Sequence, residues 1–173
     1  MKNLRAGTTL AALLAAGLLG GCTQNFWEAT PLGEVLQYEH PRVTSRKEFM
    51  RTQNAANVRA ITAAIRDNKL PDAARAADAI AKAAEEIPRQ FRRNTLAGKT
   101  TALPVIWQKK DDFDAKAKNL ATTAAALAVV LRVGDKAGSE GALRTMQGTC
   151  GACHREYRVP PPPPAQRPAA PRS

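Results

Sequence analysis

Two cysteines and a histidine close to the C-terminus carry side chains that could do chemistry. Cys150, Cys153 and His154 lie within the stretch "GTCGACHREYR", and they include two of the chain's three cysteines and one of its two histidines. Side chains of these types can bind zinc, form a redox-active dithiol or a disulfide, or attach a haem covalently. Their spacing is what distinguishes these four kinds of site.

Zinc and thiol redox chemistry fit the spacing poorly. A structural zinc site usually takes four ligands from two separated pairs, and this sequence offers one pair and His154, with His40 alone in a predicted linker. A catalytic dithiol normally lies at a helix N-terminus, where the helix dipole lowers the thiol pKa, whereas both cysteines fall near the C-terminal end of a predicted helix. A disulfide remains open for an exported chain, but it leaves His154 without a role.

A covalent haem uses every position of the motif. Cys150 and Cys153 are three residues apart, so in a helix their sulfurs share a face and can both reach the vinyl groups of one porphyrin. His154 lies one turn after Cys150, where its imidazole can ligate the iron. C-x-x-C-H is the attachment signature of c-type haem. Aromatic residues make up only 5% of the chain, and a haem would complete a core built from small side chains. The motif therefore predicts one haem c.

The N-terminus predicts export. A short positive region precedes the apolar run Leu10–Gly21, which is too short to span a bilayer and is typical of a secretory signal peptide over residues 1–21. The run ends in "LGGC", which resembles a bacterial lipobox with Cys22 as the lipidated residue. Thr23 follows where an aspartate would favour retention at the inner membrane. We therefore expect a periplasmic protein that is lipid-anchored to the outer membrane.

The basic charge does not indicate nucleic acid as a partner. The formal net charge is +11, and removal of residues 1–21 leaves 24 − 15 = +9. The positive side chains are scattered among acidic ones, with no long block of like charge, which is typical of solvated helix faces.

The chain divides into four predicted parts. They are the signal peptide 1–21, a lipidated linker 22–44, a helical domain 45–158 and a proline-rich tail 159–173. Five consecutive prolines begin at Pro160, which favours an extended tail without a packed core.

Four segments of the central part carry apolar residues at helical spacing. The first opens with Ser45 and Glu48 as a capping box, the second has Pro71 in its first turn, the third follows Pro104, and the fourth ends at about Arg158 after starting near Ser139. No segment alternates with a period of two. The predicted fold is all-α, an antiparallel up-and-down four-helix bundle. The apolar positions are Met50, Val58, Ile61 and Ile65; Ala73, Ala77, Ile80, Ala84 and Ile87; Ile106, Phe113, Ala117, Leu120, Ala124, Leu127 and Leu131; and Leu143, Met146, Cys150, Cys153 and Tyr157.

Residues 44 to 158 resemble the class II c-type cytochromes, the cytochrome c′ and cytochrome c-556 group. The resemblance lies in "RKEFM", "TTALPVIWQKKDDFDAKAKNL" and "CGACHREYR", and in haem attachment near the C-terminus. The lipobox and the proline tail depart from the pattern of that group.

The resemblance implies a role for each residue of the site. Cys150 and Cys153 would form the thioethers and His154 would be the proximal iron ligand. Arg158 would lie beside that imidazole and tune the iron, and Arg46 would pair with a haem propionate. Trp107 and Phe113 are expected to pack around the haem edge.

The sixth ligand decides the function. Met146 is eight residues from His154 on the same predicted helix, about 12 Å along its axis, so it cannot reach the other face of the iron. Met50 occupies the distal position of the resembling group. If its sulfur ligates the iron, the protein is a single-electron carrier served by periplasmic redox proteins. If it only packs there, the haem binds nitric oxide or other small gases. We expect the electron carrier, not an enzyme, and a homodimer would be compatible with the sequence.

Overall fold

Helices make up most of residues 39–162, the part of the chain that the computed structural model describes. The predicted signal peptide, the lipidation residue Cys22, most of the linker and the end of the proline tail lie outside these residues. A single antiparallel bridge joins Ala102 and Arg158, and there is no strand within the described range. The elements in chain order are α2 Pro41–Phe49, η1 Met50–Ala55, α3 Ala56–Arg66, α4 Leu70–Gln90, α5 Val105–Gln108, α6 Lys110–Arg132 and α7 Lys136–Tyr157.

The first three elements form one continuous rod. The residues at both junctions, Phe49 and Ala55, keep right-handed helical backbone angles, so the chain passes from α2 through the π-helical η1 into α3 without a break. The rod begins at Pro41. The predicted capping box at Ser45 is therefore wrong about the start, because His40 caps the helix instead: its Nδ1 accepts a hydrogen bond from the backbone N–H of Arg42 at 3.1 Å.

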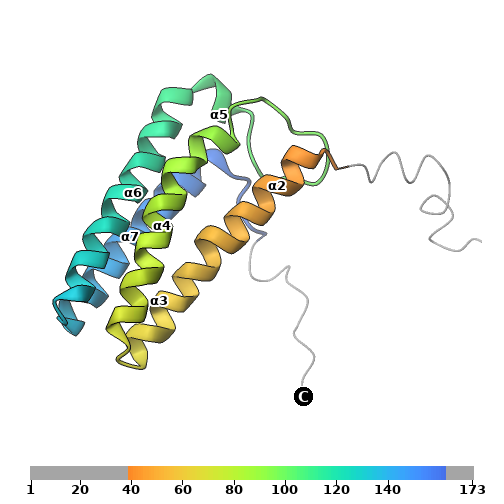
Figure 1. The fold of residues 1–173 in the computed structure, drawn as a ribbon. Coiled ribbons are helices and arrows are strands. Elements are labelled where there is room, and N and C mark those ends of the chain that lie inside the picture. The colour runs from red at the N-terminus through yellow and green to blue at the C-terminus, as the bar shows by residue number, and fades with distance from the viewer. Residues whose placement is uncertain (1–38, 163–173) are drawn as a thin grey trace, which may run out of the picture. The chain divides into compact units, whose positions relative to one another are not determined.

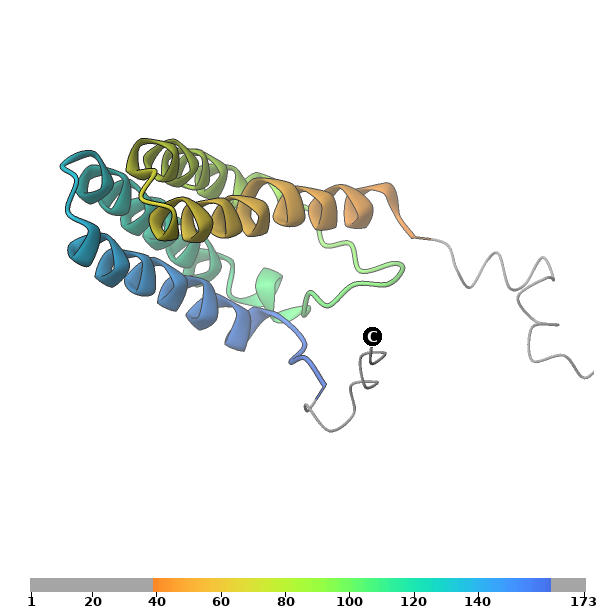
Figure 2. The ribbon, with the colours of Figure 1, turned by 90° about the horizontal axis from the view of Figure 1, so that it is seen from below.

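Four rods run up and down, which confirms the predicted antiparallel four-helix bundle (Figures 1 and 2). They are α2–η1–α3, α4, α6 with the short α5 before it, and α7. The α2–η1–α3 rod packs beside α4, α4 packs against α6, and α6 packs against α7. The turn between α6 and α7 uses Gly134 at φ +81°, a left-handed conformation that glycine adopts without a Cβ clash. The long connection between α4 and α5 lies between α2 and α7 at one end of the bundle, as Figure 2 shows.

Two further predicted helix boundaries differ from the structure. The helix predicted after Pro104 is interrupted, because Lys109 leaves the helical region (φ −120°, ψ 49°) and separates the single turn α5 from α6. The last helix begins at Lys136 rather than near Ser139, because the Asp135 carboxylate caps it by accepting a hydrogen bond from the backbone N–H of Gly138 at 2.8 Å. Arg158 is the first residue past its end.

Small side chains let the rods approach closely. Along α4 and α6 the buried face is rich in alanine, including Ala73, Ala77, Ala84, Ala124 and Ala128, each at 0% exposure. The larger buried side chains fill the layers between these close contacts. They include Ile61, Ile80, Ile106, Leu127, Leu131 and Met146. Within residues 39–162, no helix combines the length and apolar character needed to cross a membrane.

Candidate functional site

A cavity of about 680 Å³ opens into the bundle and is lined by side chains from all four rods. This volume lies within the range of pockets that hold small-molecule cofactors. The lining is mostly apolar, and basic side chains join it without any aspartate or glutamate among the lining residues. The basic members are Arg46, Lys47, Arg51, Arg59, Lys116 and Arg158.

The α7 wall of this cavity carries the cysteines and the histidine. Cys150, Cys153 and His154 all line it, and the two half-buried thiols are not joined as a disulfide. Burial raises the pKa of Cys150, and it raises the pKa of Cys153 to about 11. Both sulfurs are therefore protonated at neutral pH, the opposite of what a redox-active dithiol requires.

The surroundings of His154 favour its neutral form, although the residue as a whole is exposed. Partial burial, and secondarily the positive charge of Arg158, lower the pKa of His154. Neutral imidazole is the form that ligates a metal. The structure therefore brings a metal-ligating group to the same wall as the two thiols.

Arg158 is fixed beside the end of α7 by the connection that precedes α5. Its Nε donates to the Thr101 hydroxyl at 3.2 Å, and its backbone N–H donates to the carbonyl of His154 at 3.2 Å. The following residue, Val159, donates its N–H to the Thr101 carbonyl at 2.7 Å. The predicted tuning role of Arg158 remains a prediction, and its backbone position next to His154 is compatible with it.

An aromatic cluster packs around Tyr157 at the C-terminal end of α7. Phe113 lines the cavity and stacks edge-on against Phe91 and Tyr157, with ring centroids 5.1 and 5.2 Å away. The Tyr157 hydroxyl donates to an Asp112 carboxylate oxygen at 2.6 Å. Trp107 lies outside the cavity lining and donates its indole N–H to the Phe91 carbonyl at 2.8 Å.

Arg46 has a structural role that the sequence did not reveal. It is 5% exposed, and its guanidinium stacks over the Phe91 ring at 4.9 Å. It donates three hydrogen bonds to backbone carbonyls at the end of α4 and beyond: Nε to Gln90 at 2.7 Å, Nη1 to Thr95 at 2.8 Å and Nη2 to Arg93 at 2.6 Å. A guanidinium has five N–H groups, so two remain, and the propionate role stays a prediction.

Met50 and Asn54 form the opposite wall on η1. Both line the cavity, and the Asn54 amide Nδ2 lies 3.7 Å from the Met50 sulfur as its hydrogen-bond donor. Asn54 is 8% exposed. Sequence reasoning found Met50 and missed Asn54, although a polar residue four positions later on an apolar stripe was a signal. Met146 is fully buried in the core and does not line the cavity.

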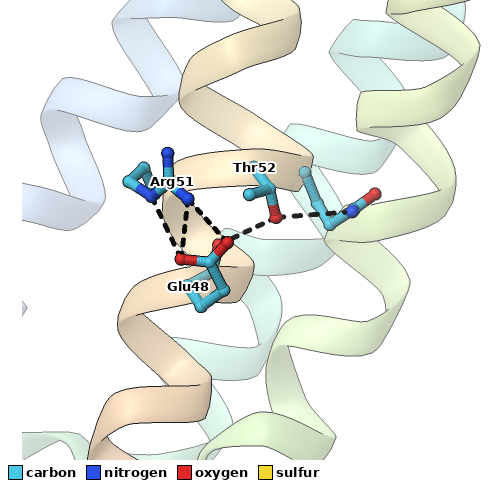
Figure 3. Close-up of polar contacts among 4 residues, drawn as sticks. Glu48, Arg51 and Thr52 are labelled. Atoms are coloured by element: carbon cyan, nitrogen blue, oxygen red, sulfur yellow. Dashed lines mark hydrogen bonds and ion pairs between the residues drawn. The ribbon is translucent and has the colours of Figure 1, made fainter.

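Exposed side chains link the end of α2 to the start of η1. Figure 3 shows the Arg51 guanidinium paired with the Glu48 carboxylate at 2.7 Å and the Thr52 hydroxyl donating to the Glu48 carbonyl at 2.8 Å. The end of η1 is closed by the N–H of Ala56, which donates to Arg51, five residues earlier. Exposed ion pairs of this kind contribute little to stability.

These residues fit a haem c. Two thiols three residues apart and an imidazole one turn on meet a large, mostly apolar cavity, and basic side chains at its edge suit a group that carries carboxylates. A zinc site built from protein ligands does not fit, because the described residues contain no cluster of three or more His, Cys, Asp and Glu that could hold a metal ion.

Comparison with known sequences gives the same result. A family model described as cytochrome C′ matches residues 42–158. A cytochrome c′ from Pararhodospirillum photometricum is 36% identical over 120 residues, which cover 67% of this chain and 94% of that protein. A cytochrome c-556 from Agrobacterium fabrum is 36% identical over 117 residues, which cover 66% of this chain and 79% of that protein.

Solved structures share the bundle. Cytochrome c′ from Thermochromatium tepidum superposes with a TM-score of 0.60 at 26% identity, over 69% of this chain and 95% of that chain. Cytochrome c′ from Rhodopseudomonas palustris, at 24% identity, superposes with a TM-score of 0.60 over 70% of this chain and 98% of that chain and supports the fold. The family match spans the whole helical part of the chain, with the C-x-x-C-H motif inside it, so the protein belongs to the class II c-type cytochromes, the cytochrome c′ and c-556 group, which carry covalent haem c.

Proposed function

We propose that this protein transfers single electrons through one haem c attached at Cys150 and Cys153, with His154 as proximal ligand and Met50 as sixth ligand. Membership of the family makes it a haem-based electron carrier or a gas-binding cytochrome. The ligand set and the choice between these two activities are our proposal.

One observation carries the choice. Met50 and His154 line the same cavity from two different rods, so an imidazole and a thioether face one apolar space. A haem bound there supplies an iron that alternates between the ferrous and ferric states. A thioether that joined the imidazole in holding such an iron would raise its potential and keep small gases from binding.

The remaining residues would bind and shield the group. Burial keeps the Cys150 and Cys153 thiols protonated, and their spacing on α7 places both at the cavity. The neutral imidazole of His154 is ready to ligate without losing a proton. The apolar part of the lining would shield the group from water, and Lys116 and Arg158 in the lining can balance negative charge that the bound group brings.

Gas binding is the second candidate, and one observation favours it. The Met50 sulfur already accepts a hydrogen bond from Asn54, so the side chain has a stable place in the cavity without any bond to a metal. In that case the iron of a bound haem would be accessible to nitric oxide or carbon monoxide.

We also propose that the protein is exported to the periplasm and anchored to the outer membrane through Cys22, where it exchanges electrons with other redox proteins. The lipobox-like "LGGC" and the signal-type N-terminus support this. Homodimer formation through the first two rods is part of the same proposal. A related cytochrome c′ of known structure undergoes ligand-controlled dimer dissociation.

The absorption spectrum of the purified, reduced holoprotein tests the function. We expect a sharp low-spin α-band that carbon monoxide leaves unchanged. In Met50→Leu the band should become broad and high-spin, carbon monoxide should bind rapidly, and the reduction potential should fall because the thioether is gone.

Met146→Leu is the matched control, because it removes a methionine of the core with little change of volume and should leave the spectrum as it was. A parent protein that is already high-spin and binds carbon monoxide rapidly would replace the electron-carrier proposal with the gas-binding one.

A further inference from the structure

We propose that Asn54 is a positioning residue that holds the Met50 thioether in place beside the haem iron. The inference rests on the proposed function, because it assigns a purpose to Asn54 through Met50. Three observations support it: the Asn54–Met50 contact, the burial of Asn54 and the π-helical backbone of η1.

The contact joins the two side chains on one face of the rod. Asn54 Nδ2 donates to Met50 Sδ at 3.7 Å, and both side chains line the cavity. A turn closed by an i→i+5 hydrogen bond takes up more than four residues, so side chains four apart stay on one face of it. Such π-helical turns occur mostly as single insertions, frequently at functional sites.

Burying Asn54 reduces the stability of the folded chain. The residue is 8% exposed, and among the described residues its amide oxygen Oδ1 has no hydrogen-bond partner. A buried acceptor without a partner destabilises the folded chain, and an apolar side chain of similar size would avoid that cost. The amide therefore brings an advantage that the fold alone does not need.

Neighbouring polar residues show what a purely structural role looks like. The Asn57 amide donates to the backbone carbonyl of Gln53 at 2.8 Å, and the Thr52 hydroxyl donates to the carbonyl of Glu48 (Figure 3). Both side chains donate to the backbone of their own rod. Asn54 instead donates its amide hydrogen to the Met50 sulfur. Any effect of Asn54 on the haem therefore acts through the Met50 side chain.

The chemistry of the sulfur explains the advantage. Methionine has three rotatable bonds and would otherwise sample many positions in a wide cavity. A thioether sulfur has two lone pairs, so one can accept the amide hydrogen while the other remains for the iron. The hydrogen bond restricts the side chain to one place and withdraws electron density from the sulfur, which favours the ferrous over the ferric iron.

Asn54→Leu in the holoprotein tests this, with Asn57→Leu as the matched control one turn away. We expect Asn54→Leu to lower the reduction potential and to tighten carbon monoxide binding by the reduced protein about threefold to tenfold, the size of one lost hydrogen bond. The unfolding temperature should not fall, because an unpartnered acceptor is removed as well. Asn57→Leu should leave the potential and carbon monoxide binding unchanged.

Repeating the substitution in a Met50→Leu background separates this inference from the proposed function. If Asn54 acts through Met50, Asn54→Leu changes neither the potential nor carbon monoxide binding in that background. Equal effects in both backgrounds, no effect in either, or weaker carbon monoxide binding in Asn54→Leu alone would overturn the inference. A high-spin parent would instead overturn the electron-carrier proposal, and the dependence on Met50 would still report on Asn54.

Discussion

The two walls of the cavity are built in different ways. On α7 the attachment residues lie within five consecutive positions of a regular helix, so the helical repeat alone brings Cys150, Cys153 and His154 to one face. On the opposite wall the helix changes to π-helical hydrogen bonding, and the Met50 sulfur is held by a side chain rather than by the helix. Local spacing determines where a haem attaches, whereas the distal side depends on individual contacts.

The anchors of the two walls also differ. The α7 wall is tied to α6 through Tyr157 and Asp112, and to the α4–α5 connection through Arg158 and Thr101. The first rod is tied to the end of α4 and to the same connection by Arg46, through three backbone carbonyls, and by the backbone N–H of His40, which donates to the carbonyl of Ala97 at 3.1 Å. The connection between α4 and α5 thus contacts both walls, and Arg46 makes most of the side-chain contacts on the distal side.

The largest effect should follow from removing the thiols of the α7 wall. In Cys150→Ala combined with Cys153→Ala, no covalent bond can form, so acid–acetone extraction should remove all haem, and intact mass should show the bare chain. The neighbouring substitution Ala152→Ser keeps both thiols and should keep one haem per chain. Haem that stays on the double variant after extraction would contradict the assignment.

An intermediate effect should follow from replacing the arginine that anchors the distal wall. Arg46→Lys keeps the charge but cannot serve three carbonyls at once, so we expect a loss of about 2–4 kcal/mol in the free energy of unfolding by urea. Arg42→Lys, an exposed change in the same helix, should shift it by less than about 0.5 kcal/mol. Equal effects of the two substitutions would show that the three contacts do not hold the wall.

The smallest effect should be a pH dependence of folding stability that arises from Asp112, whose carboxylate binds Tyr157 at the end of α7. The Tyr157 hydroxyl, and then Lys116, lower the pKa of Asp112 below its usual value of 3.8. A carboxylate with a lowered pKa adds stability that is present above the usual pKa and is lost as the pH falls through the lowered one. The difference in urea midpoint between the parent and Asp112→Asn should therefore shrink as the pH falls below the usual aspartate pKa of 3.8 and through the lowered one. The same measurement on exposed Asp111→Asn should show no such convergence, and a difference that stays constant with pH would exclude the carboxylate as its source.

The sequence by itself determined the four rods and the attachment motif. The apolar stripes that contain Ile61, Ala77, Leu120 and Leu127 are buried as expected, because helical periodicity is a local property of the chain. The C-x-x-C-H spacing is local in the same sense, so the haem and the family followed from it.

Only the tertiary structure decided the rest. The first rod starts at Pro41 because a histidine, which is not a common cap, accepts the first free N–H. The break at Lys109, the three carbonyls that bind Arg46 and the hydrogen bond from Asn54 to Met50 all depend on where the backbone and its neighbours come to lie. Such contacts have no period in the sequence, since they are set by packing between rods and by the polar groups that each turn leaves to be satisfied.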